Sequence, residues 1–241
     1  MERVALEIAA NSLAAALAAQ EGGADRVELC ENLGEGGCTP SHGTIAMARD
    51  RLRIPLHVLI RPRAGDFLYD ALERDTMLLD IENCVRLGCD GIVVGALDAD
   101  GDVDSALCAQ LLSAAGALGV TFHRAFDTAR DPLRALDDII ALGCERVLTS
   151  GARATALQGA ELIASAQRRA EGRLAVMAGA GITPDNVRDV VARTSVREVH
   201  ASAKSLQPSR MRHRSDLPGL EAGSWRSDAA IVRALRDALG A

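Results

Sequence analysis

Several short apolar runs in the sequence carry an acidic, imidazole or guanidinium side chain where a buried strand is expected to hold only aliphatic residues. One of them, Val120 to Arg124 (VTFHR), places His123 and Arg124 side by side. Because burying such a group is costly unless it is paired or hydrated, its recurrence in several runs indicates a shared polar site. The groups that recur in this way are Glu7, Glu28, His57, Arg61, His123 and His200.

These side-chain types are the ones that acid–base catalysis requires. Glu28 or Glu7 is a candidate general base, and His123 or His200 can donate or relay a proton because the pKa of an imidazole lies near working pH. Arg61 can orient an anion through paired N–H groups. The same carboxylates and imidazoles could instead hold a divalent metal ion, or form an ion-pair network that only fills the protein interior.

Glycine-rich segments supply a second signal, which concerns anion binding. The segment Met177 to Asn186 (MAGAGITPDN) places a G-x-G directly before an expected helix, and the letters TSG end an earlier apolar run. Backbone amides at a helix N-terminus favour anions, although glycine also serves in tight turns. The predicted anion-binding residues are Ser150, Gly151, Gly179, Gly181 and Ser202. Together with the acid–base groups, they indicate an enzyme that acts on a small anionic or phosphorylated metabolite.

The chain repeats one pattern that would position these groups. A helical stretch ends at glycine, a charged residue follows, and aliphatic residues run on, as in Gly23 to Leu29, Gly88 to Val94 and Gly143 to Thr149. The glycine supplies a left-handed cap, and an uninterrupted apolar run is typical of a parallel strand that is buried on both faces. Each repeat is therefore the helix-to-strand half of a βα unit.

Applied to the whole chain, this pattern predicts eight strands that alternate with eight helices. Strands are expected near Val4 to Ile8, Arg26 to Cys30, Leu56 to Ile60, Gly91 to Gly95, Val120 to Arg124, Arg146 to Ser150, Leu174 to Ala178 and Glu198 to Ser202. Helices are expected near Ser12 to Glu21, Thr44 to Arg51, Glu73 to Leu87, Asp104 to Ala115, Pro132 to Leu142, Ala156 to Ala170, Pro184 to Ala192 and Asp228 to Leu239. The order predicts an α/β fold, a (β/α)8 TIM barrel that forms a single domain over residues 1–241, with a doubly wound open sheet as the alternative.

In a barrel strand every second side chain points into the lumen. Glu28 and Cys30 share one face of their strand, and His57 and Arg61 share one face of the next. Most of these groups lie near the carboxyl ends of strands, where barrel active sites are found. His123 is therefore expected to point inward as well.

Two capping signals and one long loop complete the expected fold. Asp131 before Pro132, and Thr183 before Pro184, each place a capping side chain ahead of a proline in the first helical position. The stretch 203–226, after the last expected strand, is predicted to be a long irregular loop, which in a compact domain is usually functional or disordered.

Composition narrows the function classes. The chain has 241 residues, is 48% hydrophobic and carries a formal net charge of -6, and the absence of a basic run argues against nucleic-acid binding. No apolar stretch approaches the roughly 20 residues of a membrane span. The six cysteines form no C-x-x-C pair, which favours a reduced, cytoplasmic setting. Cys30 and Cys38 fall at the expected catalytic face and could bind Cu(I), since soft metals select thiolates, or could be inert packing residues.

Six segments resemble the copper homeostasis protein CutC family, in order and at matching separations. They are VELCENLGEGGCTPSHG, HVLIRPRAGDF, VTFHRAFD, RVLTSG, MAGAGI and EVHASA, and the likeness extends from Leu6 to the MRHRS segment at Met211. The resemblance implies a cytoplasmic barrel protein, commonly a homo-oligomer, with a role in copper homeostasis and a small-molecule or metal ligand such as copper(I).

The family pattern also bears on single positions. Cys30 matches the cysteine of the family's ELC strand. Relatives often carry further cysteines where this chain has Ala9, Ala10, Leu68 and Ala129, which weakens any copper site built from several thiolates. The lumen residues that match the family pattern are Glu7, Glu28, His57, Arg61, His123 and His200.

Overall fold

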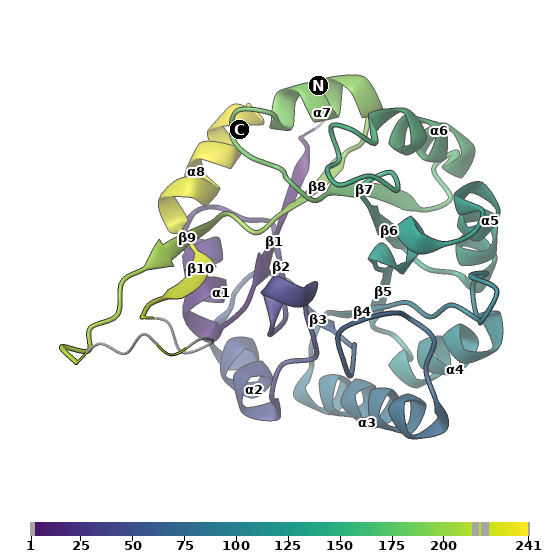
Figure 1. Cartoon of the computed structure of the whole chain (residues 1–241), viewed down its shortest axis with the longest axis horizontal. Helices are drawn as coiled ribbons and strands as arrows, with labels where there is room; N and C mark the ends of the chain where they lie inside the picture. The colour runs from purple at the N-terminus through teal and green to yellow at the C-terminus, as the bar shows by residue number, and fades with distance from the viewer. Residues whose placement is uncertain (1–2, 214–216, 218–221, 241) are drawn as a thin grey trace.

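The computed structural model describes residues 3–213, 217 and 222–240, and eight parallel strands in it close into a barrel in sequence order. The strands are β1 (Ala5–Ala10), β2 (Arg26–Leu29), β3 (Leu56–Leu59), β4 (Gly91–Val94), β5 (Gly119–Phe122), β6 (Arg146–Thr149), β7 (Ala175–Gly179) and β8 (Glu198–Ala201). The barrel closes where β8 pairs with β1, with His200 opposite Glu7. Figure 1 looks down this barrel and shows the helices as an outer ring. The predicted TIM barrel is thus confirmed over the open doubly wound sheet.

Each helix follows a strand, and the sequence marks where several of them begin and end. The helices are α1 (Leu13–Glu21), α2 (His42–Arg51), α3 (Ala71–Leu87), α4 (Ser105–Ala115), α5 (Pro132–Leu142), α6 (Ala160–Ala170), α7 (Val187–Thr194) and α8 (Ala229–Ala238). Asp131 accepts hydrogen bonds from two amides of the first turn of α5, with Pro132 at the first helical position, as predicted. Gly88 and Gly143 end α3 and α5 in the left-handed conformation, at φ 69° and 85°, which residues with a Cβ adopt less readily.

The predicted start of α7 is wrong. Helix α7 begins at Val187, whereas Thr183 and Pro184 belong to the preceding turn. The side chain of Asn186 explains the difference, because its Oδ1 accepts from the Thr183 N–H at 2.9 Å and its Nδ2 donates to the Gly181 carbonyl at 2.7 Å. These bonds hold a turn where a helix would otherwise start.

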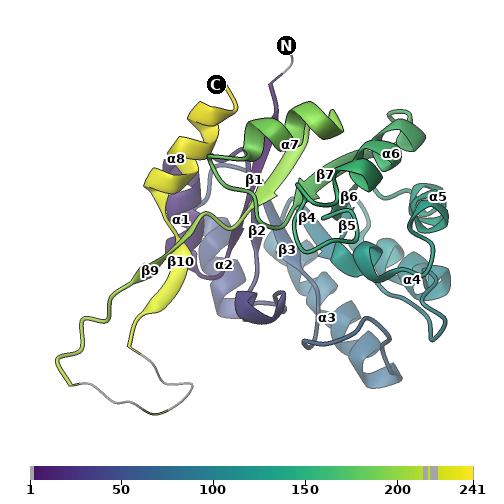
Figure 2. The ribbon, with the colours of Figure 1, turned by 45° about the horizontal axis from the view of Figure 1, so that its top comes forward.

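The predicted loop 203–226 also differs from the structure, because its two ends pair with each other. Strand β9 (Lys204–Gln207) pairs antiparallel with β10 (Ser224–Ser227), with Leu206 opposite Trp225. Figure 2 shows the two chain segments leaving the barrel side by side as a projecting arm. Residues 214–216 and 218–221 of the predicted loop, like residues 1–2 and 241 of the predicted domain, lie outside the described residues.

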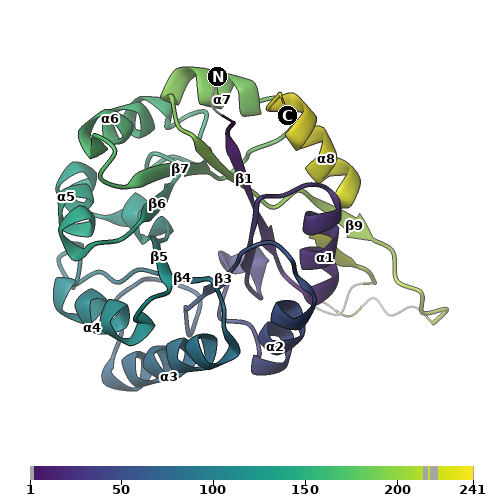
Figure 3. The same ribbon diagram turned by 180° about the vertical axis from the view of Figure 1, so that it is seen from behind.

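The strands bury side chains on both of their faces. Outward side chains such as Leu6 and Ile8 are fully buried in the main core beneath the helices, and Figure 3 shows from behind that the helices surround the strands. Inward, Cys30, Leu59 and Val93 form a second, small apolar cluster. In the part of the chain that the structure describes, no helix combines the length and apolar character needed to cross a lipid bilayer.

Candidate active site

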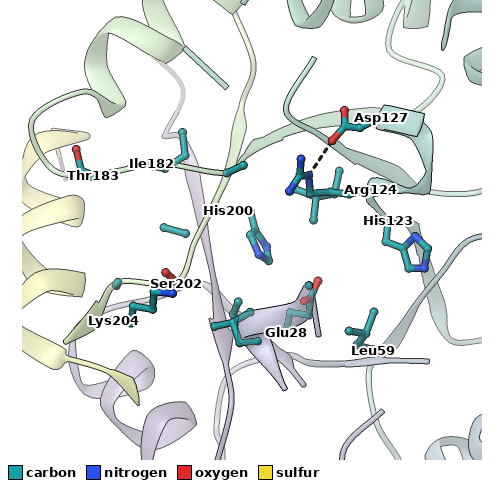
Figure 4. A pocket seen from close by; sticks show the side chains of 18 of the residues that line it. Glu28, Leu59, His123, Arg124, Asp127, Ile182, Thr183, His200, Ser202 and Lys204 are labelled. Atoms are coloured by element: carbon teal, nitrogen blue, oxygen red, sulfur yellow. Dashed lines mark hydrogen bonds and ion pairs between the residues drawn. The ribbon is translucent and has the colours of Figure 1, made fainter. Parts of the chain in front are cut away.

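A pocket of about 1060 Å³ opens inside the barrel at the carboxyl ends of the strands. Its wall is formed by strand ends and by the loops that follow β2, β3, β5, β7 and β8. The sequence-predicted residues that line it are Glu28, Arg61, His123, Gly181, His200 and Ser202. Figure 4 shows Glu28 and His200 directed toward the centre of this space, with His123 and Arg124 on another part of its wall.

Glu28 is a buried carboxylate with one unpaired oxygen. The residue is 5% exposed, and its Oε2 has no hydrogen-bond partner in the described part of the chain. Burial raises the pKa of Glu28 to about 7, although the positive charge of His200 opposes the rise. A carboxyl group whose pKa lies near working pH can accept and return protons efficiently.

Glu7 lies beside Glu28 but is held ionised. One donor atom each from Glu7, Glu28 and His200 all lie within 4.8 Å of one another. Burial alone would raise the pKa of Glu7, but the Arg26 guanidinium and the hydrogen bond with His200 hold it well below its usual range. His200 Nδ1 lies 2.7 Å from Glu7 Oε1. The pKa of His200 is raised despite burial, because the charges of Glu28 and Glu7 stabilise its imidazolium form.

The ion pair of Glu7 continues into a network toward the amino ends of the strands. Arg26 pairs with Glu7 and also donates to Glu198 at 2.6 Å. Arg146 donates to the same Glu198 oxygen at 3.0 Å. Buried charges need such partners, and the network therefore explains how the ionised carboxylate of Glu7 can be buried. It forms no hydrogen bond with Glu28 among the described residues.

His123 presents a neutral imidazole to the pocket. The main-chain N–H of Ala125 donates to His123 Nδ1 at 3.1 Å, so the ring proton is on Nε2. Burial, together with the positive charge of Arg61, lowers the pKa of His123 to about 3. Nε2 is buried without an acceptor among the described residues. Gly95 provides space for the ring, since a Cβ there would lie 2.5 Å from His123 Nδ1.

Arg61 is a buried cation that forms no ion pair within residues 3–213, 217 and 222–240. Its Nη1 and Nη2 atoms donate to three main-chain oxygens in the loops after β2 and β3, at 2.6, 2.7 and 3.1 Å. Its Nε atom has no partner there. The guanidinium carbon lies 5.1 Å from the centroid of the Phe67 ring, which also contacts the His123 ring at 4.9 Å. Arg61 therefore both fixes two loops and retains a buried N–H donor.

His57 is a lumen residue outside the pocket wall. It is 5% exposed, and its Nδ1 has no partner within the described residues. Burial lowers the pKa of His57 to about 4, so the ring is neutral. Gly91 on β4 provides its space, because a Cβ there would lie 2.6 Å from the imidazole. A catalytic role for His57 stays a prediction.

The amides after β6 bind an anion that belongs to the chain itself, the carboxylate of Asp127. Ser150 N donates to both Asp127 oxygens at 3.0 Å, and Thr149 Oγ1 donates to Oδ1 at 2.5 Å. Arg124 Nε adds an ion pair at 2.7 Å. Neither Ser150 nor Gly151 lines the pocket. Both stand where the sequence places an anion site, but the anion in the structure is internal.

Sequence reasoning missed Asp127 and Phe67. Asp127 stands in a 3-10 helix (Arg124–Thr128), three residues after Arg124, and this spacing favours a side-chain pair. Phe67 is one of only three phenylalanines in the chain. The rarity of phenylalanine in the chain, together with its place in a polar segment, could therefore have marked Phe67 as a candidate site residue.

The opposite end of the pocket is built by the loops after β7 and β8. Gly181 and Ser202 line it together with Lys204, and Figure 4 shows Ser202 and Lys204 far from His123. Gly179 does not line the pocket, and a Cβ there would lie 2.5 Å from the Leu148 side chain. The structure thus gives Gly179 a packing reason and leaves Gly181 and Ser202 available to a ligand.

The family of the chain follows from a match over residues 4–205, which fit the model described as the CutC family. The chain belongs to the CutC family. A relative from Xanthomonas axonopodis pv. citri (strain 306), described as family protein CutC, is 56% identical over 238 residues, which cover 97% of this chain and 98% of the relative. A second, from Chromobacterium violaceum, is 55% identical over 240 residues, which cover 97% of each chain. The predicted resemblance is confirmed.

A solved CutC structure shows the same architecture. The crystal structure of a candidate copper homeostasis protein CutC from Streptococcus agalactiae matches this chain with a TM-score of 0.79 and 33% sequence identity. The match covers 83% of this chain and 98% of that one. The CutC fold is therefore a TIM barrel in both proteins.

Two sets of side chains in this CutC chain bear on metal binding. Within the described residues, Glu7, Glu28 and His200 are close enough to share one ion. Two carboxylates and an imidazole suit a divalent ion rather than Cu(I), which prefers sulfur. The positive charge of Arg26, which pairs with Glu7, opposes any cation at this point.

The second set is Cys30 and Cys38, which lie near each other at the two ends of the loop after β2, outside the pocket wall. Main-chain hydrogen bonds of 2.8 and 2.9 Å between Glu31 and Cys38 fold the loop after β2 back on itself, and a Cβ on Gly37 would lie 3.8 Å from Cys30 Sγ. Cys30 is fully buried, and burial raises the pKa of its thiol well above its usual value. The pair suits Cu(I) in ligand type, but the protonation state of Cys30 does not, because the thiolate is the metal ligand.

Proposed function

We propose that this CutC-family chain is an enzyme that transfers a proton on a small anionic carbonyl compound bound in the barrel lumen. One observation carries the proposal: two buried side-chain atoms of residues that line the same pocket have no partner among the described residues, the acceptor Glu28 Oε2 and the donor His123 Nε2. Buried polar atoms without partners are uncommon in folded proteins. A ligand that supplies a proton to one and an acceptor to the other would satisfy both.

Glu28 and His123 take complementary roles in this proposal. Glu28 removes a proton from the carbon next to the carbonyl, and its pKa of about 7 is matched to that task at neutral pH. His123 donates its Nε2–H to the carbonyl oxygen, where negative charge develops as the proton leaves. Since His123 is neutral, it stabilises the oxygen as a hydrogen-bond donor and keeps its own proton.

His200 acts on Glu28 as a positioning residue. Its imidazolium form is stabilised by Glu28 and Glu7, and its charge lowers the pKa of Glu28 against the effect of burial. Without this charge, Glu28 would be protonated over more of the neutral pH range and would be a less available base. The network of Glu7 thus contributes to catalysis through Glu28.

Proton exchange with solvent tests the proposal. The protein is incubated in D2O with a panel of 2-oxo acids and phosphorylated ketoses, and proton NMR follows the loss of C–H signals beside each carbonyl. We expect exchange of at least one compound, slowed by about 10²–10⁴-fold in Glu28→Gln. Replacing His123 with Phe is expected to slow it by about 10²–10³-fold, the effect of losing one oxyanion donor.

Glu145→Gln is the matched control, because the Glu145 side chain is 58% exposed and lies outside the pocket wall. Its exchange rate should equal that of the wild type. Exchange that persists at the wild-type rate in Glu28→Gln contradicts the role of Glu28. Absence of exchange for both compound classes contradicts the proposed reaction.

Copper binding is the second candidate function, favoured by the family and by the proximity of Cys30 and Cys38. The Streptococcus agalactiae relative is described as a candidate copper homeostasis protein, and a role of this chain in copper homeostasis would follow from a Cu(I) site. The metal would have to displace the Cys30 proton, which makes affinity rise with pH. Competition with a Cu(I) chelator tests the site, with loss of about one copper per chain expected in Cys30→Ser. Equal Cu(I) affinity in the wild type and in Cys30→Ser would show that Cys30 and Cys38 do not form the site.

We also propose a reducing, cytoplasmic setting and a homo-oligomeric state. The six cysteines are free thiols, which is typical of proteins in reducing compartments. The homo-oligomeric state is proposed from the resemblance to the CutC family alone. Light scattering after gel filtration tests it, and a mass of about one chain in solution contradicts it.

A further inference from the structure

One end of the pocket contains two buried side-chain donors for which the geometry of the described residues gives no acceptor, although the Tyr69 hydroxyl lies beside Arg61. Arg61 Nε and His123 Nε2 have no partner among the described residues, and both residues line the pocket. Both contact the Phe67 ring, which lies 5.1 Å from the Arg61 guanidinium carbon and 4.9 Å from the His123 ring, and the charge of Arg61 is close enough to lower the pKa of His123. One of the two donors is cationic and has no carboxylate partner in the described part of the chain, which a buried charge would ordinarily require.

We propose that Arg61 and His123 form a subsite for a carboxylate and the carbonyl next to it, so that the substrates are small 2-oxo acids. Arg61 Nε–H binds the carboxylate and supplies its missing counter-charge. His123 Nε2–H binds the oxygen on the neighbouring carbon. The inference rests on the proposed function, because it takes Glu28 as the base.

The donors favour a carboxylate over a phosphate. A phosphate group usually binds several converging amides or a bidentate guanidinium, whereas Arg61 already donates from Nη1 and Nη2 to three main-chain oxygens. The amides after β6 hold Asp127. In the loop after β7, Thr183 N donates to Asn186. Among the described residues that line the pocket, the buried side-chain donors without a partner are therefore at the Arg61 end.

This assignment gives a balanced reaction step. Glu28 takes a proton from C3, and the electron pair of that C–H bond forms the C2=C3 double bond. The carbonyl π pair moves to the C2 oxygen, which accepts from His123 Nε2–H. Return of the proton from Glu28 to C3 regenerates the 2-oxo acid, so that no oxidant or other co-reactant is needed.

Oxalate is the probe. It has a carboxylate next to a second C–O⁻ group, as the enolate of a 2-oxo acid does, and it has no proton on carbon to lose. Calorimetric titration measures its Kd for the wild type, Arg61→Lys and His123→Leu, with Arg63→Lys as the matched control. Arg63 lies two residues from Arg61 but pairs with Asp66 and Glu73 outside the pocket wall. We expect at least tenfold weaker binding in the first two variants, unchanged binding in Arg63→Lys, and no competition by inorganic phosphate.

Either of two kinds of result overturns the subsite. The first is a Kd in Arg61→Lys and His123→Leu that is within twofold of the wild-type value, or no oxalate binding by the wild type. The second is displacement of oxalate by inorganic phosphate together with loss of binding in Lys204→Ala, which places the anion at the other end of the pocket. If Arg61→Lys does not unfold cooperatively and is therefore not folded, the Kd of oxalate in His123→Leu decides whether the subsite exists.

Glu28→Gln separates this inference from the proposed function. It should bind oxalate at least as tightly as the wild type, since a negative charge is removed, but should not exchange C–H protons. If protons exchange but the Kd of oxalate is unchanged in Arg61→Lys, the acid–base role of Glu28 is supported and the subsite is contradicted. If oxalate binding weakens in Arg61→Lys but no compound exchanges protons, the subsite is supported and the proposed reaction is contradicted.

Discussion

His200 Nδ1 lies 2.7 Å from Glu7 Oε1 in the barrel lumen, and this ion pair separates the behaviour of two neighbouring carboxylates. Glu7 is bound by His200 and Arg26, and its pKa is held well below its usual range. Glu28, whose Oε2 has no partner among the described residues, has a pKa of about 7 because of burial. Carboxylates whose surroundings push their pKa values apart are typical of sites where only one of them exchanges protons.

Glu28→Gln should stabilise the protein at alkaline pH. The pKa of Glu28 is about 7 in the folded chain against 4.5 for an unperturbed glutamate, so the folded state binds more protons and stability falls as pH rises between these values. At pH 8 the variant should be more stable by about 3 kcal/mol, and at pH 4 the difference should vanish. Urea unfolding at both pH values measures it. Equal stabilities at pH 8 contradict the raised pKa.

Glu7→Gln should destabilise the protein, because it leaves Arg26 and His200 without their shared buried partner. Breaking a buried ion pair on one side costs about 3–5 kcal/mol. Glu145→Gln, which removes an exposed partner of Arg146 at 3.6 Å, should cost less than about 1 kcal/mol. The two free energies of unfolding in urea give the comparison, and similar losses in both variants would show that the Glu7 network adds little.

Gly95→Ala should displace the His123 ring, since the new Cβ would lie 2.5 Å from Nδ1. Overpacking of this kind costs about 1–3 kcal/mol, and oxalate binding should weaken with it. Gly43→Ala in α2, where a Cβ meets nothing within 4 Å, should instead stabilise the helix by about 0.5–1 kcal/mol. Thermal unfolding and oxalate titration of both variants check this prediction. Wild-type oxalate affinity in Gly95→Ala would contradict the tight fit of the ring.

Asp127→Ala should destabilise the loop after β6. It leaves the donors Ser150 N and Thr149 Oγ1 without their acceptor, and unsatisfied buried groups cost about 1–3 kcal/mol each. We expect a loss of about 2–4 kcal/mol in urea unfolding, against a change within about 0.5 kcal/mol for the exposed Asp185→Ala. A loss below 1 kcal/mol in Asp127→Ala would mean that water replaces the carboxylate.

The fold could be predicted from the sequence because a local sequence pattern marks the βα units. Glycine, a charged residue and an aliphatic run, as in Gly88 to Val94, mark the helix end and the buried strand together. The arm was missed because β9 (KSLQ) and β10 (SWRS) are short, polar and separated along the chain. Pairing between such segments depends on long-range contacts, which no local pattern encodes.

The site could be predicted in part. Alternation along strands brought Glu28 and His123 to the lumen, where both line one pocket. It could not tell which carboxylate is paired, because Arg26 reaches Glu7 rather than Glu28 only through the register of β1 and β2. Nor could it show that the amides at Ser150 are filled by Asp127, since that contact depends on the three-dimensional course of the loop after β5.

The pKa of Glu28 is the most direct test of the central claim, and it needs no substrate. The carboxyl carbons of glutamate are labelled with ¹³C, and their chemical shifts are followed from pH 3 to pH 9 in the wild type and in Glu28→Gln. We predict one carboxyl that titrates near pH 7 in the wild type and is missing from the variant. If every glutamate of the wild type titrates below pH 5, Glu28 is not a base poised for neutral pH, and the account is contradicted.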